Sequence, residues 1–422
     1  MILGVVALTI PLLTGLAPAC ATTGPLAVAQ PYATVDGQVR AGAVRIFTDF
    51  TERQTITQDD PEPGDMFGSA LATGDFDDDG CTDLAVGASE EDEGPLNGAD
   101  GHGVVEILFG LTDRKVVKLP GSGGDRFGAA LAAGDLDGDG DDELAIGAPG
   151  GGSVYVYGQG SKLRRIKNEG GSVTDQFGEA LTTGDFDGNG TDELVIGAPG
   201  ANLIRQGEGT VTLVGKGGRR LLYSQETYGI DGLSESWDAF GAALASGDFN
   251  ADGRDDLAIG VPGEGLSSLQ RAGDYGEGAV DVIYGSPGGL RPAGAEAWTQ
   301  NTLAGEAVMY DRFGTSLAAG DLNGDGDDEL VVGVPGENAV QVLPGTKTGG
   351  LTKNHNLLIP GPKDAEFGAA VTVIDGHLVV GAPTRGEVVV YRGSVKKGSY
   401  PGVNKNGRKL AEGDGLFGFG LS

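Results

Sequence analysis

Short apolar segments recur along the chain and are separated by turns that contain glycine. Six of them read LAVGA, LAIGA, LVIGA, LAIGV, LVVGV and LVVGA, and they begin at residues 84, 144, 194, 257, 330 and 378. Each is followed by a second β-branched segment, such as GVVEILFG or GSVYVYG, and then by a weaker one. Runs of this length bounded by glycine and proline are typical of β-strands. With 79 glycines and no long helical periodicity after residue 25, the sequence predicts an all-β fold.

The predicted strands belong to a longer repeat that starts at a Phe-Gly pair. The repeated phenylalanines lie 60, 50, 63, 73, 54 and 50 residues apart, and they are Phe67, Phe127, Phe177, Phe240, Phe313, Phe367 and Phe417. A Gly-Ala-Pro triplet or a close variant follows each of the first six pairs. The chain therefore consists of seven related units, the last of which is cut short. We expect the phenylalanines to pack in the core between neighbouring units.

Five of the units carry an acidic nine-residue loop between the Phe-Gly pair and the Gly-Ala-Pro triplet. The loops are DFDDDGCTD, DLDGDGDDE, DFDGNGTDE, DFNADGRDD and DLNGDGDDE, and they begin at residues 75, 135, 185, 248 and 321. Each has an oxygen-bearing side chain at positions 1, 3, 5 and 9 and glycine at position 6. Calcium prefers six to eight oxygen ligands from one sharply turned segment, and glycine permits the turn. The sequence therefore predicts about five structural calcium ions.

The predicted ligands are the residues at positions 1, 3, 5, 7 and 9 of each loop. Position 7 is expected to contribute its backbone carbonyl, so its side chain is free to vary. The complete set is Asp75, Asp77, Asp79, Cys81, Asp83, Asp135, Asp137, Asp139, Asp141, Glu143, Asp185, Asp187, Asn189, Thr191, Glu193, Asp248, Asn250, Asp252, Arg254, Asp256, Asp321, Asn323, Asp325, Asp327 and Glu329.

An EF-hand is the obvious alternative, and the sequence argues against it. An EF-hand loop places a bidentate glutamate at position 12 and lies between two helices. Here position 12 is apolar, as Val86 and Ile146 illustrate, and both flanking segments have the composition of strands. A solvated acidic turn without an ion is the other alternative. It would crowd several carboxylates into nine residues with no compensating charge.

The charge of the chain follows largely from these loops. The chain carries 61 acidic and 29 basic residues, a net charge of −32, and 24 of the acids lie in the five loops. This balance argues against binding to nucleic acid, which needs clustered lysine and arginine. It also argues against binding to anionic membrane surfaces.

The combination of Phe-Gly, calcium loop and Gly-Ala-Pro resembles the FG-GAP repeat, which builds the seven-bladed β-propeller of integrin alpha subunits. The resemblance covers nearly all of residues 25–422, and it implies seven blades of four strands each. Bacterial secreted proteins with such repeats are the more similar type. Two units depart from the pattern, because the sixth has VIDGHLVV in place of its loop and the seventh lacks the acids.

The two ends of the chain are expected to share the closing blade. The seventh unit stops soon after its first strand, whereas residues 25–50 contain two segments, PLAVAQPYATVDG and AGAVRIFTDF, that mimic later strands of a unit. We therefore predict that residues from about 411 to 422 pair beside residues 25–50. Such closure removes the exposed strand edges that favour aggregation.

The first residues have the composition of a secretory signal. MILGVVALTIPLLTGLAPACATT has an apolar core followed by small residues, although it lacks a basic start. We predict a signal peptide over residues 1–21, cleaved after Ala21, and an extracellular protein without a transmembrane segment. A lipid anchor on Cys20 is a less favoured alternative. The only other cysteine, Cys81, stands at position 7 of the first loop, and Cys20 would leave with the signal peptide, so an intramolecular disulfide is not expected.

The resemblance to integrin propellers directs attention to the face opposite the calcium loops. Long connections there carry aromatic side chains, among them Tyr228, Trp237 and Trp298. We expect a monomeric module for binding or adhesion to an extracellular protein or glycan. Solvated surface insertions are the plainer explanation for any single one of these residues.

Two other functions remain open from the sequence. Similar propellers accompany a phospholipase D that acts on glycosylphosphatidylinositol anchors, so a hydrolase is the first alternative. The three histidines, His102, His355 and His377, belong to different units, and no catalytic constellation is visible. A lectin is the second alternative, although the loop aromatics do not repeat from unit to unit.

Overall fold

The structure is a computed structural model of the whole chain. It describes residues 25–92, 101–111, 113–115, 123–158, 163–266, 276–393, 403–404, 406–412, 418, 420 and 421. The predicted signal peptide over residues 1–21 therefore lies outside the described residues. So do Phe417 and most of the predicted closing segment after residue 412.

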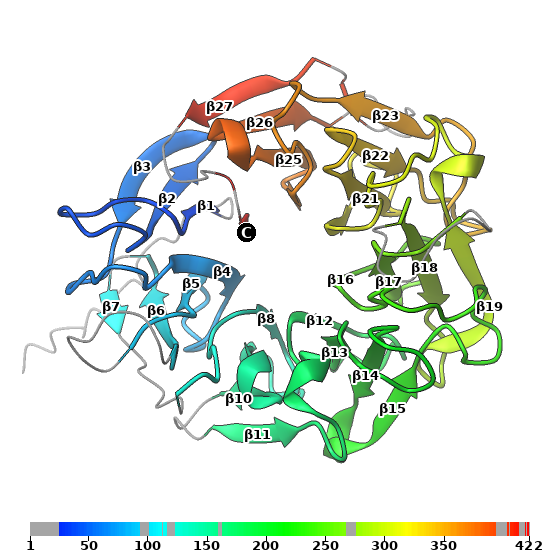
Figure 1. Cartoon of the computed structure of the whole chain (residues 1–422), viewed down its shortest axis with the longest axis horizontal. Coiled ribbons are helices and arrows are strands. Elements are labelled where there is room, and N and C mark those ends of the chain that lie inside the picture. The colour runs from blue at the N-terminus through cyan, green and yellow to red at the C-terminus, as the bar shows by residue number, and fades with distance from the viewer. Residues whose placement is uncertain are drawn as a thin grey trace, which may run out of the picture.

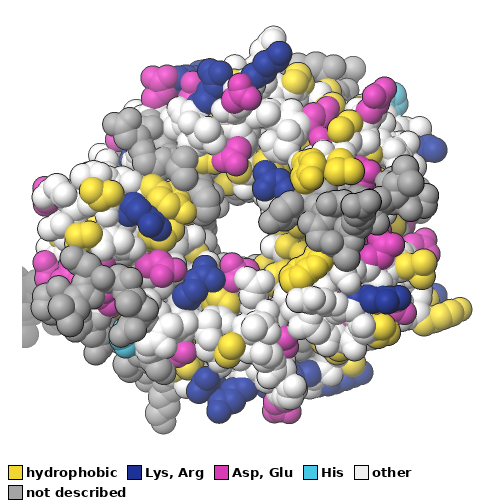
Figure 2. Space-filling model, in the orientation of Figure 1, with side chains coloured by type: hydrophobic (Ala, Val, Ile, Leu, Met, Phe, Trp, Pro, Cys, Tyr) yellow, Lys and Arg dark blue, Asp and Glu magenta, His cyan; other side chains and the backbone are white. Residues whose placement is uncertain are grey.

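Seven antiparallel sheets are arranged in a ring around a central channel, as Figures 1 and 2 show. The chain forms a seven-bladed β-propeller, as the sequence predicts. The first blade contains β1 (Leu26–Gln30), β2 (Ala43–Thr48) and β3 (Thr51–Ile56). The second contains β4 (Phe67–Gly74), β5 (Asp83–Ala88), β6 (Val104–Phe109) and β7 (Asp113–Lys115). The third contains β8 (Leu131–Gly134), β9 (Glu143–Ala148), β10 (Ser153–Tyr157) and β11 (Arg164–Lys167).

The other four blades repeat the same order of strands from the channel outward. The fourth blade contains β12 (Ala180–Gly184), β13 (Glu193–Ala198), β14 (Thr210–Val214) and β15 (Arg220–Tyr223), and the fifth contains β16 (Ala243–Gly247), β17 (Asp256–Val261), β18 (Ala279–Tyr284) and β19 (Arg291–Trp298). The sixth contains β20 (Leu317–Gly320), β21 (Glu329–Val334), β22 (Ala339–Leu343) and β23 (Leu357–Pro360). The seventh contains β24 (Ala370–Ile374), β25 (His377–Ala382), β26 (Glu387–Arg392) and β27 (Arg408–Glu412). The described helices are single 3-10 turns: η1 (Pro149–Gly151), η2 (Val173–Asp175), η3 (Lys216–Gly218), η4 (Gln300–Thr302) and η5 (Pro383–Arg385).

The hydrophobic core lies between neighbouring blades. In the five blades that carry an acidic loop, every residue of the second strand is buried, because that strand is covered on both faces. Phe127 shows the packing: it is 2% exposed and clusters with Val105 of the preceding blade and Leu144 of its own. The six described phenylalanines of the Phe-Gly pairs are all buried, which confirms their predicted place in the core.

The two ends of the chain close the ring in one blade. The backbone N–H of Ala29 in β1 donates to the carbonyl of Gly420 at 2.9 Å, and the N–H of Gly418 donates to the carbonyl of Ala29 at 3.0 Å. Val28 and Leu421 form an antiparallel bridge. The predicted pairing of the termini is confirmed, and β3 extends the amino-terminal part of this blade to Ile56, beyond the predicted limit of residue 50.

The sixth unit replaces the acidic loop by a tight hairpin. Asp375 and Gly376 join β24 to β25 with positive φ angles of 48° and 67°. Two successive residues of this kind are typical of the two-residue turns that match the twist of paired strands. The blade therefore keeps its strands without a cation-binding loop.

No helix among the described residues is long and apolar enough to cross a membrane.

Candidate calcium loops and the opposite face

The five acidic loops occupy the same place in five successive blades. Each connects the first strand to the second, as in β4–β5 and β8–β9, so all five lie on one face of the ring. The connections from second to third strand and from the fourth strand to the next blade lie on the opposite face. The architecture thus separates a face of repeated acidic turns from a face of irregular connections.

The aspartate at position 1 holds each loop in a tight turn. In the third loop, Asp185 accepts backbone N–H groups of Gly188 at 2.8 Å, Asn189 at 3.0 Å and Gly190 at 2.8 Å. The first aspartates of the other four loops accept the equivalent bonds from positions 5 and 6. The glycine at position 6 has positive φ in all five loops, which explains why no other residue stands there.

The acid at position 9 closes the loop onto the start of the second strand. One of its oxygens accepts the backbone N–H of position 2 in every loop, for example from Phe186 to Glu193 at 3.1 Å. The side chain at position 2 enters the core, and Phe186 and Phe249 are fully buried. The loop is therefore fixed at both ends, by a carboxylate and by an apolar anchor.

These contacts bring carboxylate oxygens together. Oxygens of Asp75, Asp77 and Asp83 lie within 4.8 Å of one another in the first loop. The second loop has two such groups, which share Glu143: one adds Asp135 and Asp137, the other Asp139 and Asp141. Convergent carboxylates with no softer donor suit a hard cation such as calcium.

Asparagine replaces aspartate at position 3 of the fourth loop, and its side chain tests whether this loop suits a cation. The Oδ1 atom of Asn250 is buried and has no hydrogen-bond partner in the protein. A buried amide oxygen without a partner is costly, and coordination of a cation would satisfy it. The loop also holds an internal cation, because Arg254 at position 7 forms an ion pair with Asp252 at 2.7 Å.

Burial makes the position 9 acids reluctant to ionise. It raises the pKa of Glu143 and Glu193 to about 7 and that of Glu329 and Asp256 to about 8, and neighbouring loop carboxylates add to the effect. The pKa of Asp83 rises to about 6 for the same reason. A bound cation would reverse this preference, since it favours the ionised form.

The structure adds a role for position 8, which the sequence analysis did not consider. Asp255 accepts the backbone N–H of Asp185 in the preceding blade at 2.9 Å, and its own N–H donates to the Asp185 carbonyl at 3.1 Å. Asp142 and Asp328 make the same reciprocal contact with the loops before them. The first loop, which follows a blade without a loop, has Thr82 there. The recurrence of aspartate at position 8 in the other four loops could have indicated this contact from the sequence.

Two expectations need correction. Cys81 is disulfide-bonded, so the prediction of no disulfide is wrong. The only other cysteine, Cys20, lies outside the described residues, and cleavage after Ala21 would remove it. Trp298 is the last residue of β19 and not part of a long connection.

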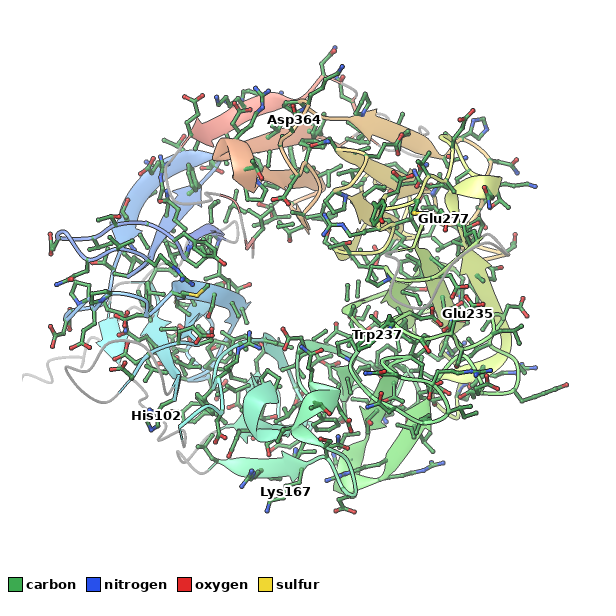
Figure 3. The ribbon with its side chains drawn as sticks, in the orientation of Figure 1. His102, Lys167, Glu235, Trp237, Glu277 and Asp364 are labelled. Atoms are coloured by element: carbon green, nitrogen blue, oxygen red, sulfur yellow. The ribbon has the colours of Figure 1, made fainter. Side chains whose placement is uncertain are left out.

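The face opposite the loops carries exposed aromatic side chains. Tyr228 is 94% exposed and Trp237 is 47% exposed, and both lie in the connection between β15 and β16. Trp237 is labelled in Figure 3 and packs against the segment around Gly207, whose carbonyl accepts the N–H of Ala239. His102 and Glu277, also labelled, belong to connections on this face.

Comparison with known proteins accounts for this repeat. The model of the FG-GAP repeat matches five segments, which are residues 67–105, 127–161, 177–214, 240–283 and 313–351. The chain is an FG-GAP repeat protein. The chain is similar to integrin alpha subunits: Integrin alpha-5 of Xenopus laevis is 31% identical over 66% of this chain, and Integrin alpha pat-2 of Caenorhabditis briggsae is 30% identical over 64%.

A second group of relatives consists of enzymes. Human Phosphatidylinositol-glycan-specific phospholipase D is 36% identical over 30% of this chain. The FG-GAP chain spans 16% of that relative, 21% of Integrin alpha-5 and 18% of Integrin alpha pat-2. Among solved structures, a protein of Bacteroides uniformis provisionally named a 6-phosphogluconolactonase has a TM-score of 0.52 at 12% identity. The structural alignment covers 90% of this chain and 94% of that protein, and it supports the propeller fold alone.

Proposed function

We propose that this FG-GAP protein is a secreted, calcium-binding propeller that acts as a module for adhesion to an extracellular protein or glycan. Five structural calcium ions would occupy the five loops, with the ligands at positions 1, 3, 5, 7 and 9. The single observation that carries this proposal is the convergence of carboxylates in successive loops, as in Asp75, Asp77 and Asp83.

Calcium would act here as a structural ion. Each loop joins the first two strands of a blade, and its position 9 acid is buried at the start of the second strand. Neutralising that acid would remove the cost of a buried charge and lock the turn. The same ions would offset part of the net charge of −32.

The face opposite the loops is our candidate for partner binding. Its connections are irregular and carry exposed apolar side chains such as Tyr228, Leu233 and Trp237. Loops on a rigid scaffold commonly carry binding residues. The similarity of this chain to integrin alpha subunits supports a role in binding an extracellular partner.

A binding screen tests the proposal. Calcium-loaded protein would be applied to arrays of extracellular matrix proteins and of glycans, and every signal would be repeated after calcium removal. A calcium-dependent ligand supports an adhesion module. Absence of any ligand on both arrays, with the protein folded and calcium-loaded, would contradict it.

A hydrolase is the second candidate, favoured by the 36% identity to phospholipase D. That match extends over 136 residues, which is 30% of this chain and 16% of the enzyme. Release of a glycosylphosphatidylinositol-anchored reporter from membranes would support this candidate. A lectin is the third, and the glycan array addresses it directly.

A further inference from the structure

A cavity of the described surface lies where two blades meet at the outer rim of the ring. It has a volume of about 330 Å3 and opens between the end of β11 and the start of β15. Its walls include Lys167, Asn168, Asn202, Thr212 and Arg220. The connections that contain Asn168 and Asn202 belong to the face opposite the calcium loops.

The equivalent place at three other blade junctions is filled by a glutamine paired with a glutamate. The Nε2 atom of Gln58 donates to Glu91 at 2.7 Å, that of Gln225 to Glu264 at 2.6 Å, and that of Gln300 to Glu337 at 2.8 Å. Each glutamine follows the fourth strand of one blade. Each glutamate is the fourth residue after the glycine of the Gly-Ala-Pro triplet in the next blade.

The β11–β15 junction lacks both members of this pair. Ala201 stands where those three junctions have glutamate, and it is buried. Asn168 follows β11, and its shorter side chain turns aside to donate to Asp175 at 3.0 Å. Two truncated side chains at a repeated position therefore open a groove that the other three junctions close.

The groove is lined by groups that bind hydroxyls and anions. Thr212 and the amides of Asn168 and Asn202 supply hydrogen-bonding groups, and Arg220 and Lys167 supply positive charge. Arg220 is oriented by its Nη1 atom, which donates to the Lys167 carbonyl at 2.8 Å. The guanidinium group has five donors, so others remain for a ligand.

Positive charge extends from the groove along both outer strands. Arg164, Arg165 and Lys167 on β11 are exposed, as are Arg219 and Arg220 at β15. Dark blue side chains mark this rim in Figure 2, and Figure 3 shows Lys167 pointing away from the ring. Five basic side chains on two neighbouring edges stand out in a chain of net charge −32.

Two acidic residues at the groove, Asp175 and Glu169, leave its positive charge largely available to a ligand. Asp175 is buried and accepts the backbone N–H of Ser172 at 2.9 Å and the amide of Asn168. Glu169 reaches to 3.9 Å from Arg220, but its side chain is 82% exposed. An exposed ion pair of this kind is weak and is readily exchanged for a ligand.

We propose that this groove binds an acidic polysaccharide, with Arg220 and Lys167 contacting its carboxylate or sulfate groups and Thr212, Asn168 and Asn202 contacting its hydroxyls. The inference rests on the proposed binding function and names a ligand class and a site for it. The alternation of hydroxyl-binding and basic groups along an open rim fits a chain of charged sugars. Arginine matches the planar geometry of carboxylate and sulfate oxygens by paired hydrogen bonds.

Direct titration tests the proposal on the calcium-loaded, full-length protein. The probes are fluorescent hexasaccharides of polygalacturonate, which offer carboxylates, and of heparin, which offer sulfates. Neutral dextran and hexaglutamate serve as comparisons. We expect one of the acidic saccharides to bind, and we expect its affinity to fall as sodium chloride rises, because salt screens the charges.

Three variants decide whether the groove is the site. Arg220→Gln should weaken binding about tenfold, as loss of a charge-assisted hydrogen bond does. Ala201→Glu introduces the residue found at the three paired junctions, and it should also weaken binding about tenfold or more. Arg291→Gln is the matched control, since Arg291 begins β19 as Arg220 begins β15, and it should leave binding within about twofold.

Several results would overturn the proposal. They are equal binding of dextran, tighter binding of hexaglutamate, no saccharide binding, or equal losses in Arg220→Gln and Arg291→Gln. Thermal unfolding of each variant checks its fold, and Arg220→Gln alone decides the question should Ala201→Glu not fold. Calcium content and binding to the array of matrix proteins are measured separately, so failure here is distinguishable from failure of the proposed function.

Discussion

Gly147 in β9 lies directly against the carbonyl oxygen of Gly178 in the next blade: a Cβ atom on Gly147 would be 2.1 Å from that oxygen. Gly178 itself has a φ of +93°, and its N–H donates to the carbonyl of Gly197 in its own blade at 2.9 Å. The glycine of Phe-Gly therefore touches the glycine of Gly-Ala-Pro in two blades at once. This contact gives the repeated motif its physical meaning.

Replacement of Gly147 by alanine should destabilise the propeller strongly. The added methyl group would force apart two backbones that cannot move independently, at a cost of about 3 kcal/mol or more. Gly288→Ala is the matched control, because a Cβ there has no neighbour closer than 3.9 Å. Urea unfolding of both variants checks the difference, and equal stability of the two would refute the contact as a constraint.

The position 8 aspartates should contribute to cohesion between blades. Asp255→Ala removes the acceptor for the Asp185 N–H, and we expect it to cost about 1–2 kcal/mol. Thr82→Ala changes the same position in the first loop, which follows a blade without a loop, and should be nearly neutral. A larger loss in Thr82→Ala than in Asp255→Ala, measured by thermal unfolding, would show that the contact is not responsible.

A neutral substitution at position 9 should have opposite effects with and without calcium. Glu193→Gln keeps an acceptor for the Phe186 N–H but removes the charge of a buried candidate ligand. With calcium present, the variant should bind one ion fewer and unfold at a lower temperature than the wild type. In calcium-stripped protein it should equal or exceed the wild type in stability, because no buried charge remains.

Glu169→Gln provides the control for that comparison, since Glu169 is an exposed glutamate outside the loops. It should change neither calcium content nor stability beyond about 0.5 kcal/mol. If Glu193→Gln destabilised the stripped protein as much as the calcium-loaded protein, the side chain would have a packing role only.

The raised pKa values predict how pH acts on the calcium-stripped protein. Burial raises the pKa of Asp256 and Glu329 to about 8 and that of Glu143 to about 7. The folded state therefore holds these protons more tightly than the unfolded state, so stability falls as pH rises from about 4.5 to 8. Urea unfolding of stripped protein at pH 5.5 and 8.5 checks the sign.

Calcium should reverse that dependence, because the ion binds the ionised carboxylates. Its affinity should decrease as pH falls from about 8 to 6, where the position 9 acids take up protons. Calorimetric titration across this range checks the trend. Calcium affinity that does not change with pH would mean that these acids are not ligands.

Much of the fold could be predicted from the sequence because the repeat is explicit. Residues 84–88 and their counterparts identify the second strands, and the extra strands in residues 25–50 identify the closing blade. Both follow from local composition, which determines strand positions directly. The position 9 acids could likewise be selected as ligand candidates by their fixed spacing.

Contacts between blades could not be predicted in the same way, because the sequence does not state which residues face each other. The reciprocal bonds of Asp255 and Asp185 join residues 70 positions apart. The disulfide of Cys81 was not expected because the other cysteine, Cys20, falls within the predicted signal peptide. The groove at Ala201 depends on a missing side chain, which becomes visible only by comparison with Glu264 in the next junction.

Calcium content measured together with stability tests the central claim most directly. Purified protein would be dialysed into calcium-free buffer, analysed by elemental mass spectrometry, and melted with and without a calcium-selective chelator. We expect about five calcium ions per chain and a clear fall in melting temperature on chelation. Protein with no bound calcium and an unchanged melting temperature would contradict it.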